Sequence, residues 1–190
     1  MIVAEAHLKS TSPYSHTRYV MDWKAPQGEQ MEYERTHWRD RIHRDAEGHV
    51  LMPGMCFKKC VEAAAVDLGT KIPGQGNKRF GQVIRQAVHV FEDVVLPVLA
   101  EEVEGEWLVV PLTPQKLNGP RGPKCFMVIP EWEATVRFNV LDTRITQEIF
   151  ATFLLRAGQL IGLGRFRPSS SSGGTYGRFE LVDLEWTDTA

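Results

Sequence analysis

The sequence predicts an α+β fold built from two β-α-β units that share one sheet. Two kinds of pattern alternate along the chain. In some segments apolar and polar side chains alternate strictly, as in a strand with one buried face. In others, apolar side chains recur every three or four residues, as on one face of a helix. The order of these segments is strand, helix, strand, twice over, which is typical of the ferredoxin-like split βαβ arrangement.

The first unit contains a long interruption. Residues 2–9 alternate between apolar and mostly polar side chains, so we expect a strand there. Residues 14–48 are polar, aromatic and charged without a sustained period, and we expect a long insertion or arm. A short strand at 49–52 and a helix over 55–68 follow it. The second strand of the unit is predicted over 82–91.

The second unit has the clearest patterns in the chain. Residues 133–141 predict a strand that places Ala, Val, Phe and Val on one side. A helix is predicted over 146–160, with Thr146 as its N-cap. A Gly/Ser-rich loop over 162–177 then leads to a last strand at 178–186. In this topology the first and third core strands lie side by side, and both helices cover one face of the sheet.

The two units are joined by a further strand and a basic loop. Residues 107–112 form an apolar run that predicts a strand, as part of a hairpin. Residues 113–124 are rich in Pro, Gly, Lys and Arg and predict a flexible basic loop. The predicted fold class is therefore a ferredoxin-like (RRM-like) core with a long insertion after its first strand and a Gly-rich loop before its last.

The composition predicts one globular domain over residues 1–190. Hydrophobic residues make up 43% of the chain and charged residues 24%, which excludes a mostly disordered protein. No apolar run is long enough to cross a membrane, and we see no signal peptide. Three cysteines in such a chain favour a reducing compartment, so we expect a cytoplasmic protein. We expect Cys56 and Cys60 to be buried small residues rather than ligands of a metal.

The charges are segregated although the formal net charge is only −2. The segments 69–91, 112–130 and 149–179 contain eleven Lys and Arg residues and no Asp or Glu. Such segregation gives a protein a positive face while its total charge stays near zero. Solvated loops without a ligand are the alternative interpretation.

The uncovered face of the predicted sheet is polar. The RNA-recognition module of the same topology reads bases on that face. The chain lacks the aromatic pairs on which such a module stacks bases, so we do not assign it to that class. The residues expected on this face are Glu5, His7, Lys9, Thr135, Arg137 and Asn139.

The Gly/Ser-rich loop is the strongest candidate for a binding site. It contains Arg165 and Arg167, ends next to Arg178, and has no acidic residue. Glycines allow another backbone to approach closely, and guanidinium groups with free amides and hydroxyls are the donors that a phosphodiester needs. The loop fails as a dinucleotide-binding motif, because it follows a helix rather than a strand. A flexible connection between helix and strand is the alternative.

Two further segments carry candidate residues. A Pro-Gly turn opens the helix over 55–68, where free amides together with Lys58 and Lys59 would favour an anion. The first strand ends in a Ser-Pro turn followed by His16, a candidate general base, and Arg18, a candidate phosphate contact. Ordinary solvated residues are the alternative in both segments.

Together the three segments resemble the RAMP superfamily, the RNA-binding proteins of CRISPR systems, and above all the backbone subunits that coat the guide RNA. The first strand with its Ser-Pro turn is similar to the N-terminal strand of the family. Residues 50–61, VLMPGMCFKKCV, resemble the Pro-Gly entry to its first helix. Residues 155–165, LRAGQLIGLGR, and 176–179, YGRF, resemble its closing Gly-rich loop and last strand.

The resemblance implies a ferredoxin-like protein that binds RNA without reading its sequence. RNA-cutting backbone subunits of the family use an aspartate after the first strand, and Asp22 lies in that region. Guide-processing members use a histidine as general base, for which His16 is the candidate. The chain also resembles a phage-borne branch of the group, which implies a stand-alone role.

These observations lead to one main prediction and two alternatives. We expect a non-enzymatic protein that coats or stacks along RNA, or single-stranded DNA, in several copies, without a cofactor or metal. The alternatives are a metal-independent endoribonuclease and a phage protein that docks into a host CRISPR complex. The predicted phosphate contacts are Lys58, Lys59, Arg165, Arg167 and Arg178, followed by His16, Arg18, Arg121, Lys124 and Arg137.

Overall fold

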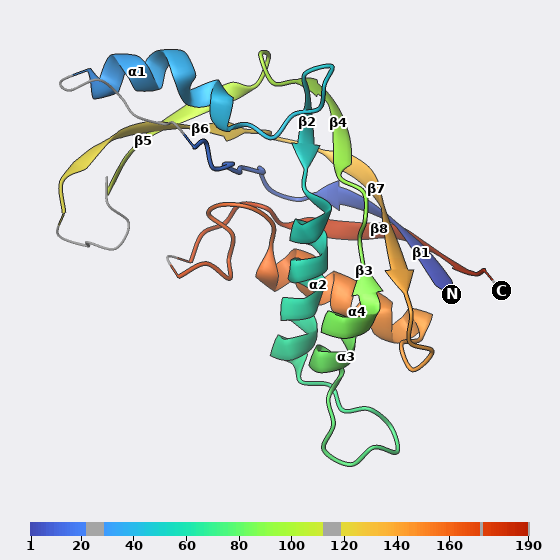
Figure 1. The fold of residues 1–190 in the computed structure, drawn as a ribbon. Helices are drawn as coiled ribbons and strands as arrows, with labels where there is room; N and C mark the ends of the chain where they lie inside the picture. Colours follow the sequence, from blue (N-terminus) through green and yellow to red (C-terminus); the bar gives the residue numbers. More distant parts are fainter. Residues whose placement is uncertain (22–28, 112–118, 172, 190) are drawn as a thin grey trace.

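The computed structural model describes residues 1–21, 29–111, 119–171 and 173–189. Its elements are shown in Figure 1. The strands are β1 (Ile2–Ser10), β2 (His49–Met52), β3 (Val88–His89), β4 (Val94–Leu99), β5 (Glu104–Pro111), β6 (Arg121–Val128), β7 (Glu133–Val140) and β8 (Phe179–Asp188). The α-helices are α1 (Gln30–His37), α2 (Gly54–Leu68), α3 (Phe80–Ala87) and α4 (Gln147–Arg156), with a 3-10 helix η1 (Trp38–Arg41) and a π-helical turn η2 (Ala157–Ile161).

The central sheet has the strand order β3-β7-β1-β8, and every neighbouring pair is antiparallel. In chain order, β1-α2-β3 forms the first unit and β7-α4-β8 the second, so the predicted ferredoxin-like α+β fold is confirmed. β1 and β7 pair in the centre of the sheet, as predicted, with Glu5 opposite Arg137 and Ala6 opposite Val136. The long insertion follows β1, and the Gly-rich loop precedes β8.

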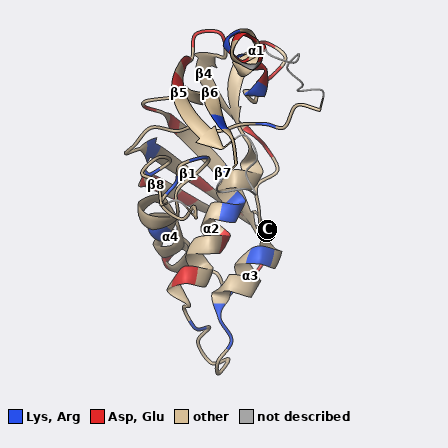
Figure 2. Cartoon of the chain, turned by 90° about the vertical axis from the view of Figure 1, so that its left-hand side faces the viewer, with Lys and Arg blue, Asp and Glu red and all other residues tan. Residues whose placement is uncertain are grey.

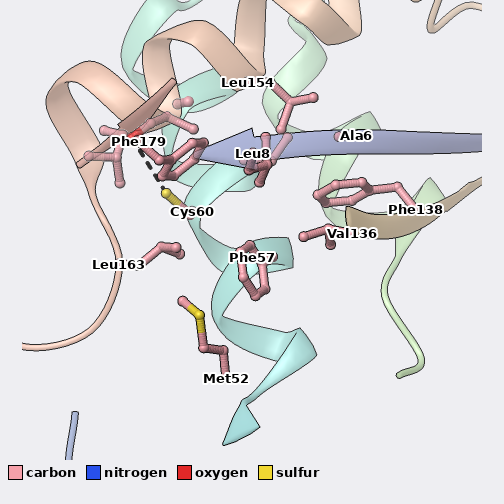
Figure 3. Close-up of a cluster of buried hydrophobic side chains, with 14 of the residues drawn as sticks. Ala6, Leu8, Met52, Phe57, Cys60, Val136, Phe138, Leu154, Leu163 and Phe179 are labelled. Atoms are coloured by element: carbon pink, nitrogen blue, oxygen red, sulfur yellow. Dashed lines mark hydrogen bonds between the residues drawn. The ribbon is translucent and has the colours of Figure 1, made fainter. Parts of the chain in front are cut away.

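The main core lies between this sheet and helices α2 and α4. Ala4, Ala6 and Leu8 of β1 alternate with more polar residues and are fully buried. Val136 and Phe138 of β7 are buried on the same side. Figure 3 shows how side chains from α2 and the end of α4 meet those of the two central strands. The period-two pattern of β1 and β7 thus predicts the buried face correctly.

Helix α2 begins one residue before its predicted start and ends at the predicted residue. Its apolar face includes Phe57, Val61 and Ala64, all buried. Gly69 caps its C-terminus with φ +60°, and its N–H donates to the carbonyl of Ala65 at 3.2 Å. A residue with a Cβ is strained in this left-handed conformation, which explains why the helix stops at a glycine.

The predicted helix over 146–160 consists of α4 and the π-helical turn η2. Thr146 is its N-cap, as predicted, because its Oγ1 accepts a hydrogen bond from the N–H of Ile149 at 3.4 Å. The π-helical turn at the end widens the helix just before the Gly-rich loop starts. Turns of this kind occur mostly as short insertions in α-helices, often at functional sites.

The strand predicted over 82–91 is wrong for most of its length. Residues 80–87 form helix α3, and only the two residues of β3 pair with β7. The buried side chains of Phe80, Val83, Ile84 and Ala87 are spaced three and four apart, which is helical spacing. The ring of Phe80 lies 5.9 Å from that of Phe153 in α4, so contact with another helix fixes this segment as helical.

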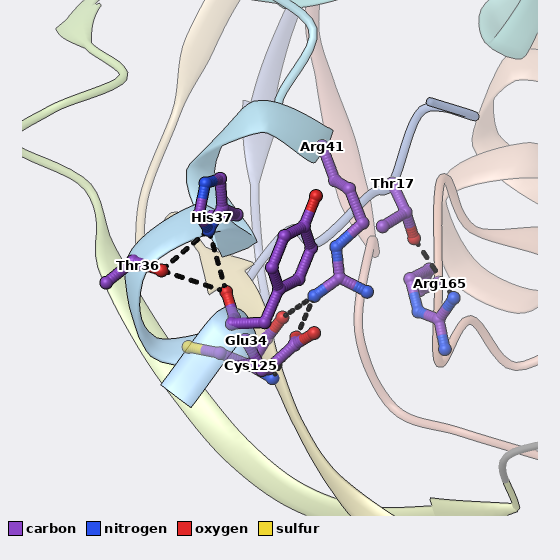
Figure 4. Close-up of polar contacts among 8 residues, drawn as sticks. Thr17, Glu34, Thr36, His37, Arg41, Cys125 and Arg165 are labelled. Carbon is purple, nitrogen blue, oxygen red and sulfur yellow. Dashed lines mark hydrogen bonds and ion pairs between the residues drawn. The ribbon is translucent and has the colours of Figure 1, made fainter. Parts of the chain in front are cut away.

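The insertion after β1 packs on the hairpin of β5 and β6. Glu34 of α1 and Arg41 of η1 are both buried and form an ion pair. The Glu34 carboxylate also accepts a hydrogen bond from the N–H of Cys125 in β6 at 2.9 Å, and Arg41 donates to the Cys125 carbonyl at 2.9 Å. Figure 4 shows these contacts. The described part of the predicted arm is therefore held against β6.

The hairpin corrects the boundaries of the basic loop predicted over 113–124. Residues 121–124 belong to β6, where Arg121 pairs with Pro111 and Lys124 with Leu108 of β5. Gly122 and Pro123 are typical of loops, so the sequence does not indicate that they belong to a strand. Strand β6 pairs with β5 on one edge, and no other strand pairs with it in the described part of the chain. Residues 112–118 lie outside the described residues. No helix in the described ranges is long and apolar enough to cross a membrane.

Candidate nucleic-acid interface

The three candidate segments of the sequence meet around one hollow of about 430 Å³. The first segment follows β1, the second is the start of α2, and the third is the loop between η2 and β8. The sequence predicted candidate residues in each segment but not that they would share a cavity. The lining residues include His16, Thr17, His43, Cys56, Lys59, Arg165, Arg167 and Ser169.

The Gly-rich loop is held in place by backbone hydrogen bonds to the segment after β1. The N–H of Arg165 donates to the carbonyl of Ser15 at 2.7 Å, and the N–H of Gly177 donates to that of Pro13 at 2.7 Å. Gly164 adopts φ +68° beside the Ser15 carbonyl, which leaves no space for a Cβ. These contacts fix the loop at residues 164–165 and at residue 177 against the segment after β1.

Arg165 is a partly buried cation. Its guanidinium lies 4.1 Å from the ring centre of Phe126, and its Nη1 donates to Thr17 Oγ1 at 3.0 Å. Burial, followed by the charge of Arg41, lowers the pKa of Arg165. Its buried Nε has no hydrogen-bond partner, and no carboxylate pairs with it within the described ranges. A desolvated guanidinium with an unused donor favours an anionic ligand.

Arg167 extends the positive charge of the hollow. It donates from Nε to Ser169 Oγ at 3.1 Å and from Nη1 to the Gly164 carbonyl at 2.8 Å. Between the two arginines, Phe166 has φ +54°, a conformation that costs about 1–2 kcal/mol for a residue with a side chain. Its ring packs edge-on against Phe126 at 5.7 Å and Tyr176 at 5.8 Å. These ring contacts fix the strained residue and thereby the backbone positions of both arginines.

The two adjacent lysines of α2 lie on different sides of the helix. Lys59 lines the hollow, and its Nζ lies 2.9 Å from Glu62. Lys58 is not among the lining residues, and its Nζ lies 3.5 Å from His89 Nδ1. The structure thus brings Lys59 together with the arginines but does not bring Lys58 there.

Two of the amides at the start of α2, which the sequence predicted to be free, are engaged within the chain, since the N–H of Cys56 donates to the Pro53 carbonyl at 2.8 Å. The N–H of Gly54 donates to the carboxylate of Asp93 at 2.8 Å. An acidic side chain of the chain itself therefore occupies part of the position where an external anion was expected. The sequence could not show this, because Asp93 lies 39 residues further along the chain.

His16 is buried at the inner end of the hollow. Its Nε2 accepts the backbone N–H of His43 at 3.0 Å, and its Nδ1 lies 3.1 Å from the hydroxyl of Tyr14. Burial, with a smaller effect of His43, lowers the pKa of His16 to about 3. The ring is therefore neutral, with the proton on Nδ1, and both nitrogens are engaged. This geometry supports a structural role for His16 rather than the predicted phosphate contact or general base.

His43 also lines the hollow, although no sequence pattern pointed to it. Its ring lies 4.9 Å from that of His16. Burial lowers its pKa, and the charge of Arg18 acts in the same direction while Asp93 opposes them. Arg18 itself is exposed and donates from Nε to the Asp40 carbonyl at 2.8 Å. His43 could not be recognised in the sequence, because contacts with other segments, such as those with His16 and Leu51, bring it to the hollow.

Cys56 and Cys60 lie at the same hollow on the α2 side. Cys60 is buried and donates from its Sγ to the Gly162 carbonyl at 3.3 Å, which ties α2 to the start of the Gly-rich loop. Burial raises the pKa of Cys60 to about 12 and also raises that of Cys56. Both thiols are therefore protonated at neutral pH. No cluster of potential metal ligands occurs in the ranges that the structure describes.

The remaining candidates are divided between the neighbourhood of the hollow and other surfaces. Burial lowers the pKa of Lys124, and the nearby charges of Arg41 and Arg165 act in the same direction while Glu34 opposes them. Lys124 therefore adds to the positive field of Arg165. Arg121 is exposed in β6 and donates to the Val109 carbonyl at 2.9 Å.

Arg178 and Arg137 are not part of this hollow. Arg178 lines a separate hollow of about 290 Å³ with Leu155, and its buried Nε has no partner among the described residues. Arg137 is on the uncovered face of the sheet, 3.9 Å from Glu5. Asp22, the candidate for RNA cleavage, lies outside the described residues.

Comparison with known proteins identifies the fold. No family model matches the sequence, and no curated protein matches it significantly. A chain in a cryo-EM structure of the type III-B Cmr-beta bound to cognate target RNA has a TM-score of 0.51 and 14% identity, over the whole of this chain. This chain spans 61% of the length of that one. Cmr6 from Pyrococcus furiosus has a TM-score of 0.49 and 16% identity, over 95% of this chain and 99% of its own. The similarity to the Cmr-beta chain shows that the two chains share a fold.

Proposed function

We propose that this protein is a CRISPR-associated RNA-binding protein that holds the sugar-phosphate backbone in the hollow between α2 and the Gly-rich loop. One observation carries the proposal: Arg165 and Arg167 meet there with Lys59, and neither arginine pairs with a carboxylate among the described residues. Hydroxyls of Thr17 and Ser169 lie beside them. These groups can donate hydrogen bonds to phosphate oxygens, and such contacts do not distinguish one base from another.

The RAMP-like fold supports the same proposal. The similar Cmr-beta chain comes from a complex bound to cognate target RNA. By analogy, we propose that this chain coats or stacks along RNA in several copies within a CRISPR-type complex in the cytoplasm. We keep a stand-alone phage-encoded role as a prediction from the sequence resemblance alone. Single-stranded DNA has the same phosphodiester groups, so it can be added as a competitor of RNA in the binding experiment described below.

The endoribonuclease alternative is not favoured by the surroundings of His16. A general base needs a free nitrogen within reach of the substrate hydroxyl. Both nitrogens of His16 are engaged, and its lowered pKa makes it a weak base. We therefore propose binding without cleavage as the function of this hollow.

The proposal is tested with the double variant Arg165→Gln, Arg167→Gln. Binding of labelled oligoribonucleotides of several unrelated sequences is measured by fluorescence anisotropy over a range of salt concentrations. We expect affinity to fall by a similar factor for every sequence. The slope of log K against log salt should decrease by roughly 0.7 for each phosphate of the single strand that the variant no longer neutralises.

Two controls make the test specific. The variant Arg35→Gln, Arg144→Gln removes two exposed arginines away from the hollow and should leave affinity and slope unchanged. The variant Arg165→Lys, Arg167→Lys keeps the charge but loses the forked donors, so it should bind with intermediate affinity. Wild-type affinity and slope in the glutamine variant, or equal loss in the exposed control, would reject this hollow as the RNA site.

A further inference from the structure

A second and larger hollow, of about 680 Å³, lies outside the proposed RNA site. It is bordered by β4, by the turn between β4 and β5, and by the connection from β6 to β7. None of its lining residues belongs to the first hollow. The lining residues are Lys9, Ser10, Leu96, Pro97, Val98, Glu102, Val103, Glu104, Val128, Ile129, Pro130, Glu131, Trp132 and Glu133.

The floor of this groove is apolar. Leu96 and Ile129 are buried, while Val98 and Val128 are partly exposed to it. Trp132 is only 5% exposed, and its indole Nε1 has no hydrogen-bond partner among the described residues. Such a floor accepts apolar side chains.

The rim of the groove is acidic. Glu102, Glu104 and Glu131 are exposed, and none of them forms an ion pair within the described ranges. Glu133 contacts His7 at 2.6 Å, and Lys9 is the cation among the lining residues. The rim therefore carries an excess of negative charge that the neighbouring side chains do not neutralise.

The uncovered face of the central sheet continues this negative surface. The register of the sheet places three acids of β8 on the same side as Glu5, because Glu185 is opposite Glu5, Asp183 opposite His7 and Glu180 opposite Lys9. Figure 2 shows acidic segments beside β5 and β8, basic segments on α3, and both kinds on α2. Lys9 and Arg137 lie on the same sheet face, but its acids outnumber these cations, which disfavours phosphate there.

We propose that the acidic groove is the docking site for a basic segment of a partner protein, in which Lys or Arg alternates with apolar residues. In an extended segment alternate side chains point to opposite sides, so apolar ones would enter the groove while basic ones meet the glutamates. Strand β4 pairs only with β2 in the described part of the chain, which leaves one of its edges for backbone pairing with such a segment.

The proposal is tested with a synthetic peptide in which Lys alternates with Val and Leu. Its binding to the full chain is measured by fluorescence anisotropy, together with two comparison peptides. One has Glu in place of Lys, and the other has Gly in place of the apolar residues. We expect the first peptide to bind and both comparison peptides to bind at least about tenfold more weakly, because the groove combines charge with an apolar floor.

Two protein variants locate the binding. The variant Glu102→Gln, Glu104→Gln, Glu131→Gln should weaken the Lys-Val-Leu peptide about tenfold or more, since it removes the unpaired charges of the rim. The matched variant Glu32→Gln, Glu47→Gln, Glu148→Gln changes three exposed glutamates elsewhere and should leave binding unchanged. Equal weakening in both variants, or equal binding of the Lys-Gly peptide, would overturn the proposal, because general charge attraction would then explain it.

Two further measurements separate this proposal from its competitors. Sedimentation velocity on the groove variant alone should give the wild-type size. A smaller species would overturn the proposal and identify a second copy of this chain as the occupant. The variant Arg165→Gln, Arg167→Gln should bind the peptide like wild type. Because these arginines lie at the other hollow, failure of RNA binding and failure of peptide binding are distinguishable.

Discussion

His16 is a histidine whose surroundings keep it uncharged in the folded protein. Its Nε2 accepts a hydrogen bond from a backbone N–H, and a protonated Nε2 could not accept this bond. The residue is only 5% exposed. The neutral ring joins the segment after β1 to the segment before β2. Protonation would break this connection, so the folded state holds the proton less tightly than the unfolded state does.

This difference predicts a loss of stability in acid. The pKa of His16 is about 3 in the folded protein. In the unfolded chain it is about 6.5. The contribution of His16 is fully present above the unfolded value and is lost at about 1.4 kcal/mol per pH unit as the pH falls toward the folded value. Between pH 7 and pH 5, the free energy of unfolding measured in urea should therefore fall by about 2 kcal/mol more in wild type than in His16→Gln. Parallel pH curves for the two proteins would contradict the assignment.

Single residues of the hollow were predictable from the sequence only in part. Arg165 and Arg167 were candidates because cations next to glycines and serines, without acids, are typical of phosphate sites, and Lys59 because it follows a helix N-terminus. The contact of Lys58 with His89 and the burial of His16 beside His43 were not predictable, because the partners come from distant segments. Charge type is a local property of a sequence, whereas burial and pairing depend on tertiary contacts.

The buried carboxylate of Glu34 connects helix α1 to its neighbours. Glu34 accepts hydrogen bonds from Arg41 and from the N–H of Cys125, so the carboxylate links α1, η1 and β6. A buried ion pair adds little compared with apolar residues of the same volume, but loss of one partner leaves a buried charge uncompensated. The carboxylate therefore matters more for where α1 lies than for how stable α1 is by itself.

Removing this carboxylate should destabilise the protein strongly. We expect Glu34→Ala to lower the free energy of unfolding by about 3–5 kcal/mol, because Arg41 and the Cys125 amide lose a buried acceptor. The matched change Glu32→Ala in the same helix affects an exposed ion pair and should cost about 1 kcal/mol or less. Equal losses for the two variants, measured by urea unfolding, would show that the buried pair does not hold the helix.

At the level of secondary structure, the long periodic segments were predictable and the short ones were not. β1, β7, α2 and α4 have patterns long enough to distinguish period two from helical spacing. Helix α3 has only eight residues and is followed at once by the two-residue strand β3, so its short helical spacing is easily taken for part of a strand. The docking of the arm on β6 had no local signal, since Glu34 and Cys125 are 91 residues apart.

The whole molecule separates opposite charges onto different surfaces. Arg165 and Arg167, which have no carboxylate partner among the described residues, lie at the hollow beside α2, whereas carboxylates gather at the groove and on the uncovered sheet face. Such a separation allows a chain with a formal net charge of −2 to have a locally positive surface. The sequence already indicated the segregation, but not the faces on which each sign would lie.

If several copies coat RNA, the purified protein should carry RNA with it. We expect a high ratio of absorbance at 260 nm to that at 280 nm, and a large species in size-exclusion chromatography that becomes smaller after ribonuclease treatment. The variant Arg165→Gln, Arg167→Gln should give a protein-like ratio and a size that ribonuclease does not change. A protein-like ratio for wild type, with an unchanged size, would contradict stable coating.

Cys125 and Phe126 are neighbours in β6 and belong to two different connections. The backbone of Cys125 binds Glu34 and Arg41 of the arm (Figure 4). The ring of Phe126 lies against the guanidinium of Arg165, with 4.1 Å between the guanidinium carbon and the ring centre. A shift of the described part of the arm is therefore expected to move β6 and, with it, the ring against which the Arg165 guanidinium lies. A protein that binds the insertion after β1 would then alter the position of Arg165 without touching the hollow.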